Sequence, residues 1–207
     1  MKPEEQSFAS MFAVLKQKRA YFLIFQFACI APFGMFTAFN YKRIAFERNP
    51  YFLENDHLIT TIGSVGIICN GLFRSAWGIL FDHFSYRKII ITINICLLAF
   101  CGLILIAVQN VVAYFLIIPG IYLSYGGLYA ILPTQSVRVL GPVIGSKLFW
   151  LLFGGFTFAA IIQFTLQYFL LTYLGSDGYY YCLGTFFVLQ IIGLIIGITV
   201  HYDYEES

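Results

Sequence analysis

Six apolar stretches of 21 to 26 residues run through this 207-residue chain. They are Ala20 to Asn40, Leu58 to Phe81, Ile89 to Gln109, Val111 to Leu132, Leu148 to Tyr173 and Tyr180 to Val200. About 20 apolar residues in a helix are enough to cross the hydrocarbon core of a bilayer, which is ~30 Å thick. Because lipid cannot hydrogen-bond the backbone, segments that cross it must be helical or form a closed barrel. The sequence therefore predicts an all-α membrane protein with six transmembrane helices.

Composition supports this class and argues against several others. Hydrophobic residues make up 60% of the chain and charged residues 11%, which is more apolar surface than a soluble domain of this length can bury. The net charge of +2 is scattered, so no nucleic-acid partner is expected. The five cysteines lie inside the apolar stretches without CxxC spacing, so we expect no metal and no other cofactor. No nucleophile, paired-carboxylate or metal-ligand pattern occurs in these stretches, so the chain is not expected to be an enzyme.

The segments outside the apolar stretches are assigned as follows. Residues 1–19 form a predicted interfacial amphipathic helix, because Phe8, Met11, Phe12, Val14 and Leu15 recur at helical spacing beside Lys16, Lys18 and Arg19. Residues 20–200 form the six-helix bundle, and residues 201–207 an acidic polar tail. Within the bundle, Asn110 alone joins the third and fourth helices, whereas Tyr41 to His57 is predicted as a longer polar loop. The start of the chain lacks the apolar segment of a secretory signal peptide.

Basic residues are distributed unequally between the two ends of this predicted bundle. The end that holds both termini carries Lys2, Lys16, Lys18, Arg19, Arg87, Lys88, Arg138 and Lys147. The opposite end carries Lys42, Arg43 and Arg48. Since basic loops stay on the cytoplasmic side, or on its matrix equivalent, both termini of this multi-pass protein are predicted to lie there.

Arg74 is the most unusual residue of the second apolar stretch. An arginine near the middle of a membrane helix costs about 2.5 to 3.5 kcal/mol on insertion scales, so such residues usually face a bundle interior or an aqueous pathway. Arg74 is therefore a candidate anion-binding residue or one half of a buried ion pair, with Asn70 one turn earlier on the same face. A second interpretation is that Arg74 snorkels to the membrane surface, because Phe81 is only about 10 Å further along. Both interpretations remain open at this point.

Two motifs around Arg74 resemble a known family of transporters. The segment GILFDHFSYRK, with Gly78, Asp82, Arg87 and Lys88, resembles the cytoplasmic loop signature of the major facilitator superfamily. It departs from that signature at His83, Ser85 and Tyr86. The preceding segment NGLFRSAWG, with Asn70, Gly71, Arg74 and Gly78, resembles the eighth helix of oxalate/formate antiporter and monocarboxylate transporter relatives. The six stretches together look like the last six helices, the C-terminal half, of such a transporter.

This resemblance implies roles for several side chains. Arg74 matches an arginine that anchors a substrate carboxylate, and the loop signature matches a charge network that latches two halves together. Oxalate-type relatives have a second cation in the eleventh helix, whereas the matching stretch here has Gln163 and Gln167 but no Lys or Arg. These glutamines either face a cavity as hydrogen-bonding groups or join helices to one another. The segment AILPTQSVRVLGPVIGSK looks like the loop between the tenth and eleventh helices.

Two functional hypotheses follow from the resemblance. Transporters of this architecture bind substrate between two six-helix halves, and the six stretches match only one half. The favoured hypothesis is a half-transporter-like, non-transporting accessory subunit of a larger membrane complex, surrounded by lipids and other membrane subunits, with the mitochondrial inner membrane as its expected location. The alternative is a dimeric or heteromeric secondary transporter of a small monocarboxylate that uses Arg74 as its anion anchor. The altered loop signature and the missing second cation favour the first.

Overall fold

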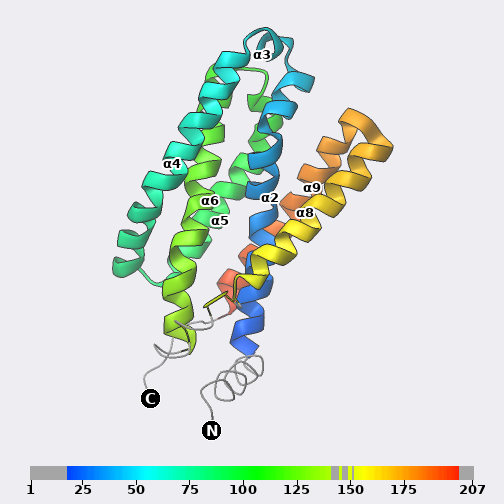
Figure 1. The fold of residues 1–207 in the computed structure, drawn as a ribbon. Coiled ribbons are helices and arrows are strands. Elements are labelled where there is room, and N and C mark those ends of the chain that lie inside the picture. The colour runs from blue at the N-terminus through cyan, green and yellow to red at the C-terminus, as the bar shows by residue number, and fades with distance from the viewer. Residues whose placement is uncertain (1–17, 141–144, 146–148, 151, 201–207) are drawn as a thin grey trace, which may run out of the picture.

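The computed structural model describes residues 18–140, 145, 149–150 and 152–200, and the regular structure in them is helical (Figure 1). Within these residues six long helices follow one another, with two short ones between them. They are α2 (Lys18–Arg48), α3 (Pro50–Glu54), α4 (Asp56–His83), α5 (Tyr86–Ala107), α6 (Val111–Leu140), α8 (Gly154–Leu174), η1 (Gly175–Asp177) and α9 (Gly178–Thr199). The prediction of an all-α protein is confirmed for these residues, and the six predicted transmembrane helices correspond to the six long helices.

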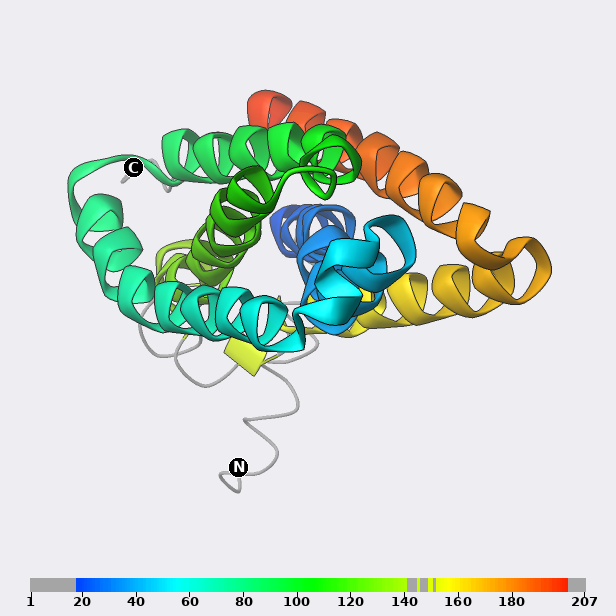
Figure 2. The ribbon, with the colours of Figure 1, turned by 90° about the horizontal axis from the view of Figure 1, so that it is seen from above.

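The long helices pack around two central members, α2 and α6. Figure 2 shows α4 and α8 on one side of this pair and α5 and α9 on the other. Helix α4 packs on α6, and α8 packs on α2. In the most apolar 18 residues of α2 67% of the segment is buried, whereas in those of α4 only 17% is buried. The helix that carries Arg74 thus exposes most of its surface.

Five segments of the described residues are long and apolar enough to cross a membrane. Four of them correspond to α2, α4, α5 and α6, while the fifth, Gly154–Thr199, contains both α8 and α9. A straight helix of 46 residues would be about 69 Å long, more than twice the hydrocarbon thickness. Instead the chain reverses at Gly175, whose φ of 56° favours glycine, and α9 packs back on α8. The architecture is that of an integral, multi-pass membrane protein.

Two predicted loops are wrong in their extent. Residues 41–57 are not one polar loop, because α2 continues to Arg48 with Ile44 and Ala45 fully buried against the bundle. The helix stops at Asn49, whose side chain accepts the N–H of Tyr51 and caps α3. Likewise α6 continues through Pro133 to Leu140, so residues 130–140 are helical rather than part of the loop between two helices.

The tight turn predicted between the third and fourth helices is present, but Val108 and Gln109 belong to it as well as Asn110. Helix α5 ends at Ala107 and α6 begins at Val111, where the Asn110 side chain accepts the N–H groups of Val112 and Ala113. The start of the predicted fifth stretch at Leu148 and the tail 201–207 lie outside the described residues. So does the predicted amphipathic helix of residues 1–19, apart from Lys18 and Arg19, which begin α2. The start of α2 and the end of α9 lie at the same end of the bundle (Figure 1), whose placement on the positive-inside face stays a prediction.

Candidate anion-binding site

The side chain of Arg74 is held on the exposed surface of α4 by Asn70. Both Nε and Nη2 of Arg74 donate to Oδ1 of Asn70, at 3.2 and 2.8 Å. Arg74 lies nine residues, or about 14 Å, before the end of α4 at His83. Its guanidinium reaches back toward the middle of the helix, as side chains four residues apart do, rather than forward to the nearer end. This geometry favours a site within the span over a snorkelling side chain.

Three tyrosines of α6 complete the surroundings of Arg74. Together with Ile67, Asn70 and Arg74 they line a concavity of about 160 Å³; they are Tyr122, Tyr125 and Tyr129. The Arg74 guanidinium lies 4.9 Å from the centroid of the Tyr129 ring, within the range of a cation–π interaction. The hydroxyl oxygens of Tyr125 and Tyr129 are 2.6 Å apart and share a hydrogen bond. The concavity therefore combines one cation, one amide and phenolic hydroxyls.

No carboxylate of the described residues neutralises Arg74. The ion pairs found among these residues join Lys42 to Asp56, at 2.5 Å, and Arg43 to Glu47, at 2.9 Å. A guanidinium has five N–H donors, of which Asn70 accepts two. Arg74 thus keeps donors, and its full positive charge, for an anionic group.

Sequence reasoning did not single out the three tyrosines. They recur at helical spacing, three and four residues apart, beside Gly126 and Gly127. Tyrosines spaced in this way next to small residues were the available signal. The signal is weak in so aromatic a chain, because the same spacing describes an ordinary packing face.

The four residues of the loop signature, Gly78, Asp82, Arg87 and Lys88, lie on two helices and do not form one cluster of contacts. Gly78 lies in α4, Asp82 is exposed near the end of that helix, and Arg87 and Lys88 lie in the first turn of α5. Asp82 makes no ion pair or hydrogen bond with any described residue. Arg87 instead donates to the carbonyl of Ile198 near the end of α9, a favourable position for a cation at a helix C-terminus.

Arg138 of α6 makes a related contact with the end of α4. Its Nη2 donates to the carbonyl of Phe81 at 3.4 Å, and its guanidinium lies 4.1 Å from the Phe81 ring centroid. In the described part of the chain, contacts to the ends of α4 and α9 are therefore made by Arg138 and Arg87.

Gln163 and Gln167 form a chain of amides between α8 and α2. Gln163 donates to Gln167 at 2.6 Å, and Gln167 exchanges two hydrogen bonds of 3.0 Å each with Asn40. Gln163 is fully buried, whereas Gln167 borders a groove of about 360 Å³ that also includes Arg43. Of the two roles left open by the sequence, these bonds favour helix-to-helix contact.

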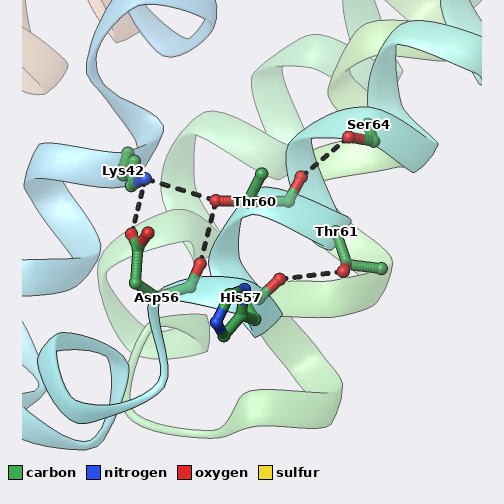
Figure 3. A network of polar contacts seen from close by, with 6 residues as sticks. All are labelled: Lys42, Asp56, His57, Thr60, Thr61 and Ser64. Atoms are coloured by element: carbon green, nitrogen blue, oxygen red, sulfur yellow. Dashed lines mark hydrogen bonds and ion pairs between the residues drawn. The ribbon is translucent and has the colours of Figure 1, made fainter.

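A polar network fastens the start of α4 to α2 (Figure 3). Lys42 bridges the Asp56 carboxylate and the Thr60 hydroxyl, which in turn donates to the Asp56 carbonyl. The hydroxyls of Thr61 and Ser64 donate to carbonyls one turn earlier, those of His57 and Thr60. Every hydroxyl in this network is satisfied, so its arrangement is that of a structural contact. Across the described residues, no three His, Cys, Asp or Glu side chains cluster as metal ligands would.

Comparison with known proteins relates the chain to a transport protein. No family model matches it. Over 126 residues it is 27% identical to apicoplast pyruvate carrier 1 of Toxoplasma gondii. The match covers 58% of this chain but only 22% of the carrier, so the chain spans about a fifth of that relative's length. The chain is thus a helical membrane protein with a distant, partial similarity to a membrane transporter, and this similarity weakly disfavours an enzyme.

Proposed function

We propose that this bundle binds a small monocarboxylate at Arg74 and forms one side of a carboxylate transport pathway. The observation that carries the proposal is the Arg74 guanidinium, held by Asn70 at a tyrosine-lined concavity with no carboxylate partner in the described residues. The similarity to a pyruvate carrier supports it, because pyruvate is a small monocarboxylate.

The chemistry of the site matches such a ligand. A planar guanidinium binds a carboxylate through two parallel N–H···O bonds, which are stronger than bonds between neutral groups. At about 30 Å³ per water molecule, a concavity of about 160 Å³ holds the volume of roughly five waters. This volume is large enough for an anion of a few heavy atoms beside Arg74.

A pathway requires a second unit opposite Arg74, because transporters of the resembled architecture bind substrate between two repeats. The low burial of α4 fits this requirement, since a facing six-helix unit would cover the exposed surface of that helix. A second copy, a partner subunit or a longer form of the same polypeptide would each supply it. The proposed bundle is then the C-terminal half of a major facilitator fold.

A non-transporting accessory subunit is the second candidate, and one observation favours it. Asp82 has no partner among the described residues, so within this bundle the loop signature forms no charge network around Asp82. In this role Arg74 would bind a carboxylate of another membrane subunit or a lipid phosphate. The mitochondrial inner membrane is the location we propose with this candidate.

Two measurements separate the candidates. The first is the native mass of the protein after mild detergent extraction from its own membrane, with comigrating subunits identified. The second is uptake of radiolabelled pyruvate by vesicles of that membrane, for wild type, Arg74→Ala and the control Arg43→Ala. Carboxylate transport predicts uptake that only Arg74→Ala abolishes while the native assembly persists. A large assembly of unrelated subunits that loses the Arg74→Ala variant, with unchanged uptake, would establish the accessory role instead.

A further inference from the structure

The amide of Asn70 forms hydrogen bonds with two partners of different kinds. Its Oδ1 accepts the Nε–H and an Nη2–H of Arg74, and its Nδ2 donates to the carbonyl of Tyr122 at 2.9 Å. A side chain at this position must therefore offer an acceptor to α4 and a donor to α6. A carboxylate lacks the donor, and an aliphatic side chain lacks both.

The position of Asn70 is fixed by close approach of the two helices. A Cβ atom added to Gly126 of α6 would lie 2.9 Å from the Asn70 carbonyl oxygen and 3.1 Å from its Nδ2. Two turns along α4, Trp77 makes a parallel contact by donating to the Leu123 carbonyl at 2.9 Å. Both the backbone and the side chain of Asn70 thus contact α6, and the same side chain is hydrogen-bonded to Arg74.

We propose that Asn70 is a positioning residue that fixes the Arg74 guanidinium without neutralising its charge. An amide carries no net charge, so its two bonds to Arg74 orient the guanidinium while leaving one unit of positive charge for the ligand. The donors on Nη1 and the second Nη2–H stay directed away from Asn70, and they form the edge that a carboxylate would bind. This inference rests on the proposed function, because it assigns Asn70 a role in carboxylate binding.

Charge and hydrogen bonding predict different rankings of Asn70 variants. Asn70→Asp keeps the shape of the side chain and an acceptor for Arg74, but its carboxylate pairs with the guanidinium and competes with an anionic ligand. Asn70→Leu keeps the volume, removes all three hydrogen bonds and, like asparagine, leaves the charge of Arg74 uncompensated. If Asn70 served only to hold the helices and Arg74 in place, Asn70→Asp would be the milder change. If neutrality matters, Asn70→Asp is the more severe.

The test is equilibrium binding of radiolabelled pyruvate at pH 7 to the purified full chain, with any copurifying partner, in lipid nanodiscs. We expect Asn70→Leu to weaken binding at least 3-fold and Asn70→Asp at least 10-fold, with thermal unfolding of both variants close to wild type. Asn70→Ala replaces Asn70→Leu if the latter misfolds, and Asn55→Asp, at the residue directly before α4, controls for an added negative charge. Wild-type affinity in the neutral variant, or binding by Asn70→Asp as tight as by the neutral variant, would overturn the inference. If the proposed function itself is wrong, Arg74→Gln will bind pyruvate no differently from wild type. This result separates failure of the proposed function from failure of the inference about Asn70.

Discussion

The ring of Tyr129 on α6 contacts both the Arg74 guanidinium on α4 and the Phe156 ring on α8. The guanidinium carbon is 4.9 Å from the Tyr129 ring centroid, and the centroids of Tyr129 and Phe156 are 4.5 Å apart in a stacked arrangement. One aromatic side chain therefore connects the candidate anchor to two further helices. A movement of α8 against α6 that displaced the Tyr129 ring would therefore change its contact with the Arg74 guanidinium.

Replacing Tyr129 by leucine should weaken carboxylate binding. A cation–π interaction is worth about 0.5 to 2 kcal/mol, so we expect Tyr129→Leu to reduce pyruvate affinity roughly 2- to 30-fold. Tyr129→Phe keeps the ring and loses the hydrogen bond to Tyr125, so its affinity should stay closer to wild type. Binding titrations with pyruvate measure both variants, and equal affinities for Tyr129→Leu and wild type would show that the ring does not support Arg74.

Adding a methyl group at Gly126 should destabilise the bundle. The new Cβ would lie 2.9 Å from a backbone oxygen of Asn70, which cannot move aside without shifting α4, so we expect Gly126→Ala to lower the free energy of unfolding by about 1 to 3 kcal/mol. Gly71→Ala is the matched control, because nothing lies within 4 Å of its added Cβ. Since alanine is the better helix former, that variant should be neutral or stabilised by up to about 1 kcal/mol. Thermal unfolding in one detergent compares them, and two equal shifts would refute the close approach of α4 and α6.

Asn40 and Gln167 should be energetically coupled. Their reciprocal hydrogen bonds of 3.0 Å join α2 to α8. Interhelical hydrogen bonds in membrane proteins average about 0.6 kcal/mol and reach about 1.7 kcal/mol in double-mutant cycles. We expect a coupling within this range from the cycle of Asn40→Leu, Gln167→Leu and the double variant. Strictly additive effects would mean that the two amides are not bonded in the membrane.

The ion pair between Lys42 and Asp56 should contribute little to stability. Both side chains are exposed, at 39% and 57%, and exposed pairs are typically worth less than about 1 kcal/mol. Lys42→Ala should therefore change the free energy of unfolding by less than about 1 kcal/mol, with an effect that shrinks as salt is added. Arg48→Ala should be more severe, because Arg48 donates to the Tyr180 hydroxyl and the Ser176 carbonyl and ties α2 to the α8–α9 turn. Denaturation at low and high salt checks this ranking.

The fold was predictable where apolar length alone decides it. All six stretches correspond to long helices, because a membrane leaves the backbone few alternatives. The extension of α2 to Arg48 was not predictable from polarity, since Lys42, Arg43, Glu47 and Arg48 look like a loop until Ile44 and Ala45 are seen to be buried. Helix α6 also passes through Pro133, which the sequence alone did not predict.

The site was predictable only in part. Arg74 was identified because a cation in an apolar helix is rare, and Asn70 because it lies one turn away. The tyrosines of α6 carry no such signal, and the packing of α6 on α4, which includes Gly126 against Asn70, brings them to Arg74. The partner of Gln167 is Asn40, which is 127 residues distant in sequence, so their contact required the structure.

The central claim is that Arg74 binds a carboxylate, and its most direct test is binding of pyruvate to purified protein with one arginine removed at a time. Arg74→Gln and Arg43→Gln remove the same charge from α4 and from α2, where Arg43 already pairs with Glu47. We predict at least a 10-fold loss of pyruvate affinity for Arg74→Gln and wild-type affinity for Arg43→Gln. Undiminished binding by Arg74→Gln, in protein that unfolds at the wild-type temperature, would contradict the claim.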